Sequence, residues 1–156
     1  MWVTASDWRG QFPIGYGKEL ASMDLIHLFR RETGFQTIAP GQPIFLAGDS
    51  GRIMFVLIEG HADILVGDEV VESAWPGAIF GEMALIDSAP RSASVLARTE
   101  CHLLPIDVDT FNTLIQKTPD FARHVMKVMA DRIRNMNHRN TLRIEHLLNS
   151  RTCVVA

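Results

Sequence analysis

The residues best suited to chemistry in this 156-residue chain lie in one segment, residues 80–95, which reads FGEMALIDSAPRSASV. An acid, Glu82, stands nine positions before a base, Arg91. The residues beside the acid and the base are small: Gly81, Ser92 and Ala93. Arg91 carries a planar, permanently charged fork that can hold two phosphate oxygens at once. Glu82 has only acceptor oxygens, which suit a ribose hydroxyl, so the segment indicates a site for part of a nucleotide.

A short apolar run lies between the acid and the base. Met83–Ile86 predicts a single helical turn, and Ala89-Pro90 would end it. A helix that begins after a glycine leaves unpaired backbone N–H groups with a partial positive charge, and such a turn attracts an anion. The alternative is that Glu82 and Arg91 pair with each other beside a tight turn, although a surface ion pair does not require small neighbours.

The elements that would position this segment are mostly short strands. From residue 35 to residue 106, β-rich runs alternate with glycine and proline turn signals. The expected strands cover residues 35–39, 44–46, 53–58, 62–66, 70–74, 92–97 and 101–106. Many short strands at regular spacing favour a closed or double-sheet β architecture over a parallel sheet with crossover helices.

Helices are expected on both sides of the strands. A short amphipathic helix is predicted over residues 23–31, and a second over Val108–Lys117 with Asp107 or Asp109 as its N-cap. A long helix is predicted over residues 119–140, and Leu142, Ile144, Leu147 and Leu148 could prolong it before Asn149-Ser150 stops it. These helices would flank a single β domain.

The long helix carries an apolar stripe at heptad spacing, formed by Met126, Met129, Ile133 and Met136. One interpretation is a core face packed against the strands. The other adds a second role, as a lid over a bound base or as a dimer contact, and flexible methionine suits a surface that repacks. The basic stretch 132–143 could indicate nucleic acid, but the formal net charge of −3 and the pI near 6.0 favour a solvated helix face.

The segment 80–95 resembles the phosphate-binding cassette of the cyclic nucleotide-binding domain family, which includes catabolite activator proteins, regulatory subunits of cyclic-AMP-dependent kinase and cyclic-nucleotide-gated channels. The resemblance implies that Glu82 binds the ribose 2′-hydroxyl and that Arg91 binds the cyclic phosphate. It also implies a cradle of backbone N–H groups at Gly81, Met83, Ala84, Ser92 and Ala93. The implied fold is mainly β with flanking helices: a double-stranded β-helix, or jelly-roll barrel, with a short N-terminal helix and a long C-terminal helix.

The function implied by the resemblance is a cyclic-nucleotide receptor or regulatory domain. Ligand binding would move the C-terminal helix, which closes over the base or pairs with its twin in a homodimer, and would signal to a separate effector protein. In the family, a threonine after the arginine tends to accompany cyclic GMP. Because Ser92 stands there, cyclic AMP is the expected ligand and cyclic GMP the alternative.

Two other interpretations of function stay open. The domain could be a ligand-free scaffold or oligomerisation module, or it could sense another phosphate-bearing ligand such as a cyclic dinucleotide. No enzyme activity and no cofactor are expected, because no nucleophile and base stand at a telling spacing in the sequence.

The domain organisation expected from the sequence is a single domain over residues 23–140, with an extension of unclear role at residues 1–22 and a tail at 141–156. Met23 is a candidate ancestral start. The tail is too short for a DNA-binding module, and no apolar run reaches the length of a membrane span. Two distant cysteines and histidines without metal-ligand spacing indicate a cytoplasmic protein without a disulfide framework or metal site. His61, at a hairpin turn, is expected to be exposed.

Overall fold

The computed structural model describes residues 34–152, with side chains described up to residue 150. The helix expected at residues 23–31 and the extension at residues 1–22 lie outside the described residues. The described strands are β1 (Gln36–Ile38), β2 (Pro43–Phe45), β3 (Ile53–Glu59), β4 (Ala62–Val66), β5 (Glu69–Ala74), β6 (Ile79–Phe80), β7 (Ser94–Ala97) and β8 (Cys101–Asp107). The described helices are α2 (Met83–Ile86), α3 (Val108–Lys117) and α4 (Pro119–Thr152).

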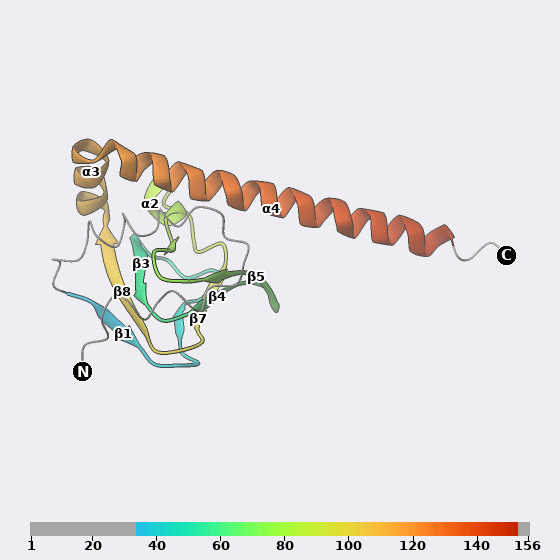
Figure 1. Ribbon diagram of the computed structural model, residues 1–156, viewed down its shortest axis with the longest axis horizontal. Coiled ribbons are helices and arrows are strands. Elements are labelled where there is room, and N and C mark those ends of the chain that lie inside the picture. Colours follow the sequence, from blue (N-terminus) through green and yellow to red (C-terminus); the bar gives the residue numbers. More distant parts are fainter. Residues whose placement is uncertain (1–33, 153–156) are drawn as a thin grey trace, which may run out of the picture.

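The strands form two antiparallel sheets that enclose a core between them (Figure 1). One sheet has the order β1-β8-β3-β6 and the other the order β2-β7-β4-β5. This arrangement confirms the predicted jelly roll with flanking helices, and each of the seven expected strands is present. Strand β6 was not expected, because two residues after the turn at Pro76-Gly77 are too few to show any alternation.

Strand β3 is buried on both faces, which explains its continuous apolar sequence. Phe55 and Leu57 belong to the core cluster between the two sheets. Met54 and Val56 point to the opposite face, where Phe121 of α4 packs in the same cluster. The first part of α4 is therefore fixed against the outer face of the β1-β8-β3-β6 sheet.

Helix α3 begins and ends where the sequence predicts. The side chain of Asp107 caps it by accepting a hydrogen bond of 2.8 Å from the backbone N–H of Thr110, and this bond lowers the pKa of Asp107. Thr118 ends α3. Pro119 opens α4, a position at which its missing N–H leaves no helix bond unmade.

Helix α4 is longer than the sequence analysis predicts. The expected end near Asn140 is wrong, since α4 continues to Thr152. Residues 141–150 contain no glycine or proline and include several good helix formers, so nothing in them ends the helix. The C-terminal half projects well beyond the sheets (Figure 1).

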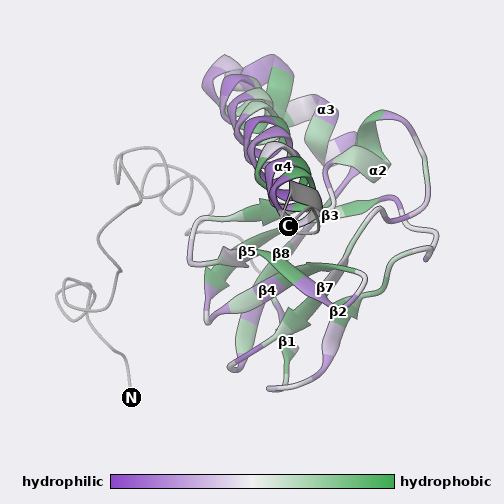
Figure 2. Cartoon of the chain, turned by 90° about the vertical axis from the view of Figure 1, so that its right-hand side faces the viewer, coloured by the Kyte–Doolittle hydropathy of each residue, from purple (hydrophilic) through white to green (hydrophobic). Residues whose placement is uncertain are grey.

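The heptad stripe of α4 divides into a packed part and an exposed part. Met129 packs against the core cluster that contains Phe121 and Val125. Met126, Ile133 and Met136 are exposed. Figure 2, which looks nearly along α4, shows hydrophobic and hydrophilic residues both present on this helix above the sheets. The core-face interpretation therefore holds for only part of the stripe.

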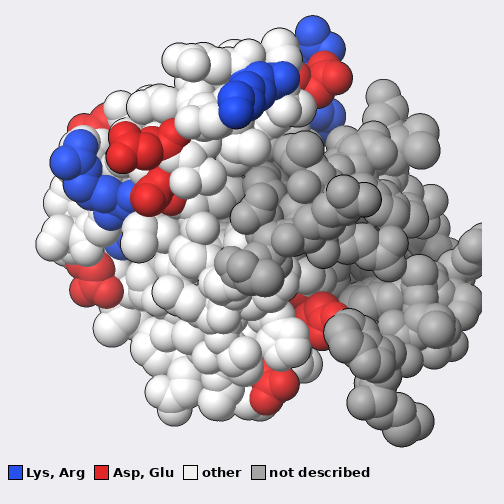
Figure 3. Space-filling model, turned by 90° about the vertical axis from the view of Figure 1, so that its left-hand side faces the viewer, with Lys and Arg blue, Asp and Glu red and all other residues white. Residues whose placement is uncertain are grey.

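The surface of the described residues carries both signs of charge, and His61 is partly covered there. On the face seen in Figure 3, basic and acidic side chains lie next to one another. His61 is only partly exposed, because its ring stacks on that of Trp75 with the centroids 4.2 Å apart, so the prediction of an exposed residue is wrong.

Within residues 34–152, no helix combines the length and the apolar composition that crossing a membrane would require.

Candidate functional site

The segment singled out in the sequence forms a loop that runs from β6 through α2 to β7. Helix α2 is the single turn predicted at Met83–Ile86, with Glu82 at its N-cap. Gly81 has φ of +82°, a left-handed conformation that favours glycine. The first N–H that bonds back within the turn belongs to Leu85, so the N–H groups of Met83 and Ala84 have no partner inside the helix.

Arg91 is buried beneath this loop, with only 8% of its surface exposed. Its Nη1 donates to the carbonyl oxygen of Gly81 at 3.1 Å, and its Nη2 donates to that of Ile53 at 2.7 Å. The guanidinium also lies 4.2 Å from the centroid of the Phe45 ring, a favourable cation–π position. Burial lowers the pKa of Arg91, while the charges of Asp49 and Glu82 act in the opposite direction.

The charge of Arg91 is not neutralised by direct pairing. Among the described residues, no carboxylate forms an ion pair or a hydrogen bond with it. The alternative in which Glu82 and Arg91 pair with each other is therefore wrong. A buried cation held only by carbonyl oxygens and an aromatic ring is well suited to receive an anion.

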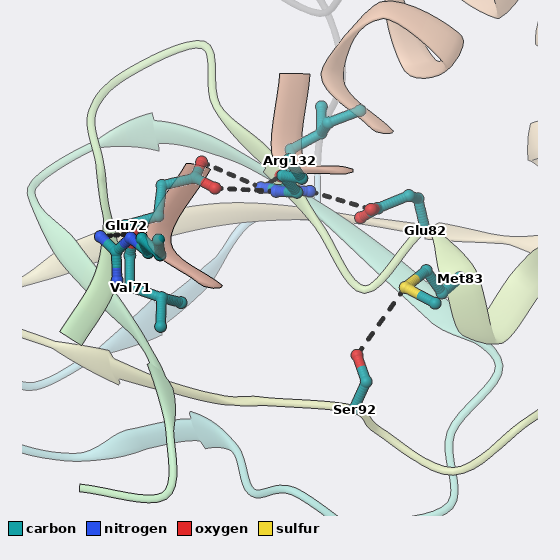
Figure 4. A network of polar contacts seen from close by, with 8 residues as sticks. Val71, Glu72, Glu82, Met83, Ser92 and Arg132 are labelled. Atoms are coloured by element: carbon teal, nitrogen blue, oxygen red, sulfur yellow. Dashed lines mark hydrogen bonds and ion pairs between the residues drawn. The ribbon is translucent and has the colours of Figure 1, made fainter. Parts of the chain in front are cut away.

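Glu82 is paired instead with an arginine from α4. Glu82 is 3% exposed, and its Oε1 accepts a hydrogen bond of 2.9 Å from Arg132 Nη1 (Figure 4). The other donors of Arg132 reach Glu72 of β5, at 2.9 and 3.1 Å, and the carbonyl oxygen of Ile79, at 2.7 Å. Burial acts to lower the pKa of Arg132, but the two carboxylates outweigh it and the pKa is raised.

Arg132 was not identified by the sequence analysis, which placed the basic stretch on a solvated face. That prediction is wrong for Arg132, whereas Arg139 is exposed, although its Nη2 donates to the carbonyl oxygen of Val71 at 2.6 Å. A signal was present: Arg132 and Arg139 follow the buried Val125 at intervals of seven residues, which places all three on one face of the helix.

The remaining predicted site residues lie in the same loop. Ser92 Oγ lies 3.7 Å from Met83 Sδ, and both residues are exposed (Figure 4). Ala84 is buried, and Ala93 packs against the core between the sheets. The structure thus brings the seven predicted residues into one loop, with an exposed rim and a buried arginine.

The fold and the site together define a β-roll domain in which one loop contains a buried arginine and an arginine of the long C-terminal helix holds the carboxylate of Glu82. Residues 35–118 match the family model described as "Cyclic nucleotide-binding domain". This match covers more than half of the chain, which therefore belongs to the cyclic nucleotide-binding domain family.

Known proteins similar to this chain include ion channels and a catabolite activator protein. The human potassium/sodium hyperpolarization-activated cyclic nucleotide-gated channel 4 is 30% identical over 119 residues, which cover 74% of this chain and 10% of the channel. The chain therefore spans about a tenth of the length of this curated relative. The crystal structure of Thermus thermophilus catabolite activator protein is similar with a TM-score of 0.62 and 28% identity, over 81% of this chain and 61% of that chain. A protein of a cyclic-GMP-dependent signalling pathway that regulates bacterial phytopathogenesis is similar with a TM-score of 0.61 and 26% identity, over 76% of this chain and 95% of that chain.

Proposed function

We propose that this domain is a receptor for a cyclic mononucleotide, with cyclic AMP as its preferred ligand, and that it acts by binding rather than by catalysis. The observation that carries the proposal is the buried guanidinium of Arg91, which has no carboxylate partner among the described residues. It lies beneath the loop of residues 81–93, which we call the cassette loop. In the proposed complex, Arg91 binds the cyclic phosphate. The N–H groups at Gly81, Met83, Ala84, Ser92 and Ala93 complete the contacts to the phosphate oxygens.

In this proposal, Glu82 binds the ribose hydroxyl of the ligand. One of its oxygens, Oε1, is engaged by Arg132. Within residues 34–150, no side chain or backbone N–H donates to the other oxygen, Oε2. A carboxylate held at one oxygen by a fixed arginine presents the second as an oriented acceptor, and the ribose 2′-hydroxyl is the donor that fits it.

The choice of cyclic AMP rests on Ser92. A serine at this position departs from the threonine that tends to accompany cyclic GMP in the family, and its hydroxyl makes only a weak contact with Met83 Sδ. Cyclic GMP is the second candidate, because a similar protein belongs to a cyclic-GMP-dependent pathway.

Signalling to an effector protein would pass through α4. A ligand that changes the hydrogen bonding of Glu82 also changes the environment of Arg132, and with it the position of α4 on the sheets. Such a ligand shifts the helix only to the extent that it binds one position of α4 more tightly than the other. Arg132 is therefore the proposed link between the nucleotide and the effector.

The exposed part of α4 is the proposed contact with a second copy of the chain. Every described side chain from residue 133 to residue 150 is exposed, although this stretch carries several large apolar residues. Met126, Ile133, Asn140 and Leu147 recur at intervals of seven, and one asparagine at such a position is typical of two-stranded coiled coils. A helix this exposed gains most of its stability from a partner, and the projecting half of α4 leaves room for one (Figure 1).

The test of the proposed function is titration calorimetry of nucleotide-free protein with cyclic AMP, cyclic GMP and cyclic di-GMP. Binding of cyclic AMP at micromolar or lower concentration, and tighter than the other two, would support the proposal. Tighter binding of cyclic GMP would change the ligand, and tighter binding of the dinucleotide would favour the alternative sensor. Absence of binding to folded protein would favour a scaffold or oligomerisation module.

A further inference from the structure

Gly51, in the loop between β2 and β3, lies directly against the guanidinium of Arg91. A Cβ atom placed on Gly51 would come within 2.6 Å of Nη2, 3.0 Å of Cζ and 3.1 Å of Nε of that side chain. Real Cβ atoms essentially never approach a heavy atom as closely as 2.6 Å, so either the guanidinium or the loop would have to move.

The backbone does not explain why residue 51 is a glycine. Gly48, three residues earlier, has φ of +88°, and Gly81 has φ of +82°, both in the region that favours glycine. The φ of Gly51 lies outside that region, so an alanine could adopt the same conformation. What the missing side chain provides at this position is space, and the group that fills the space is the guanidinium of Arg91.

The contacts of Arg91 show what that space achieves. Gly51 and Gly81 both lie against the guanidinium, and a Cβ on Gly81 would come within 2.5 Å of Nη1. The carbonyl oxygens of Ile53 and Gly81 accept its hydrogen bonds, and the ring of Phe45 lies 4.2 Å away. An added methyl group at residue 51 would push the guanidinium away from these partners. Because the guanidinium ends a flexible side chain, it would move more readily than the backbone of the loop that contains Gly51.

We propose that Gly51 is a positioning residue for Arg91. The absence of a side chain at residue 51 determines the position of the guanidinium, and this position determines how Arg91 binds the phosphate of the ligand. The inference rests on the proposed function for its effect on affinity. The contact itself belongs to the ligand-free protein and can be tested without any nucleotide.

The binding test compares Gly51→Ala in two backgrounds, the natural Arg91 and Arg91→Lys. The lysine head is slimmer than a guanidinium and leaves room for the added methyl group. We expect Gly51→Ala to weaken cyclic AMP binding at least tenfold when residue 91 is the natural arginine. In the Arg91→Lys background, we expect it to weaken binding less than threefold. Equal losses in the two backgrounds, or unchanged affinity beside Arg91, would overturn the inference.

The control variant is Gly67→Ala, at the turn between β4 and β5. Gly67 has φ of +61° and no heavy atom within 4 Å of its hypothetical Cβ, so this substitution strains the backbone without contacting Arg91. We expect it to lower the denaturation midpoint and to leave affinity unchanged. If Gly51→Ala fails to fold, recovery of the fold by Arg91→Lys would support the contact, and no recovery would overturn it.

The ligand-free test is the NMR signal of the Arg91 Nε–H group, assigned by its loss in Arg91→Lys. We expect Gly51→Ala to shift this signal and Gly67→Ala to leave it in place. A signal that does not respond to Gly51→Ala would overturn the inference whether or not nucleotide binds. If the natural protein binds no cyclic nucleotide but the signal shifts, the proposed function fails while the contact between Gly51 and Arg91 stands.

Discussion

Arg132 Nη1 lies 2.9 Å from Glu82 Oε1, so a side chain of α4 holds the cassette carboxylate from fifty positions away in the sequence. The same guanidinium binds both oxygens of Glu72 on β5. One arginine therefore joins three elements: the cassette loop, an edge strand and the long helix. Glu82 and α4 are therefore in direct contact through one side chain.

Replacement of Arg132 tests this link. Arg132→Gln leaves the buried carboxylate of Glu82 without its cation, and removing one partner of a buried pair costs about 3 kcal/mol of unfolding free energy. Hydrogen exchange should also become faster in the part of α4 around residue 132. Chemical denaturation and exchange mass spectrometry measure the two effects.

The matched control for that variant is Arg134→Gln on the same helix. The Arg134 side chain is 73% exposed and pairs with Asp131, so we expect a loss of at most about 1 kcal/mol. Equal destabilisation by both variants would show that the contacts of Arg132 with Glu82 and Glu72 stabilise the fold no more than an exposed ion pair does.

Replacement of Glu82 tests the proposed ribose contact. Glu82→Ala should weaken cyclic AMP binding about tenfold, or roughly 1.4 kcal/mol, because a hydrogen bond to a charged acceptor is lost. The natural protein should prefer cyclic AMP over its 2′-deoxy analogue, and the variant should bind both equally. The control is Glu69→Ala, which removes an exposed acid of β5 that pairs with Arg139. A Glu82→Ala protein that still discriminates against the analogue would disprove the ribose role.

The exposed stripe of α4 predicts self-association. Ile133→Glu places a charge on the proposed coiled-coil face and should raise the dimer dissociation constant at least tenfold, as measured by analytical ultracentrifugation. Leu142→Glu is the control, since Leu142 is as exposed as Ile133, 52% against 55%, but nine helical positions away on the opposite face. A monomeric natural protein, or equal effects of both variants, would contradict the proposed dimer.

His124 predicts a loss of stability at acidic pH. Among residues 34–152, no group forms a hydrogen bond with its buried Nε2, and burial together with the charge of Lys127 lowers the pKa of His124 below its usual 6.5. The unfolded chain therefore takes up a proton at a higher pH than the folded protein does. The stability that depends on neutral His124 is present above pH 6.5 and is lost as the pH falls below it.

The measurement for this prediction is urea denaturation at about pH 7.5 and about pH 5.5, a range in which histidine changes charge. His124→Gln should reduce the loss of stability between the two values, and His138→Gln, at an exposed position of α4, should leave it unchanged. If both variants follow the natural protein, His124 does not cause the pH dependence.

The strands and α2 could be predicted because their signals are local. Short β-rich runs between turn glycines mark the strands, and the proline after Ala89 marks the end of the helical turn at Met83–Ile86. The end of α4 was misplaced, since Asn140 is a weak stop when good helix formers follow it. Neither the Arg132–Glu82 contact nor the approach of Gly51 to Arg91 leaves a local pattern, because each depends on how distant elements pack.

The role of Arg91 in phosphate binding is tested by titration calorimetry, which measures the affinity of the natural protein and of Arg91→Ala for cyclic AMP. We expect at least a tenfold loss of affinity in the variant, because Arg91 is the proposed partner of the phosphate charge. Arg91→Lys should fall between the two, since it keeps the charge but loses the fork. Equal affinity of the natural protein and a folded Arg91→Ala variant would show that Arg91 does not bind the phosphate.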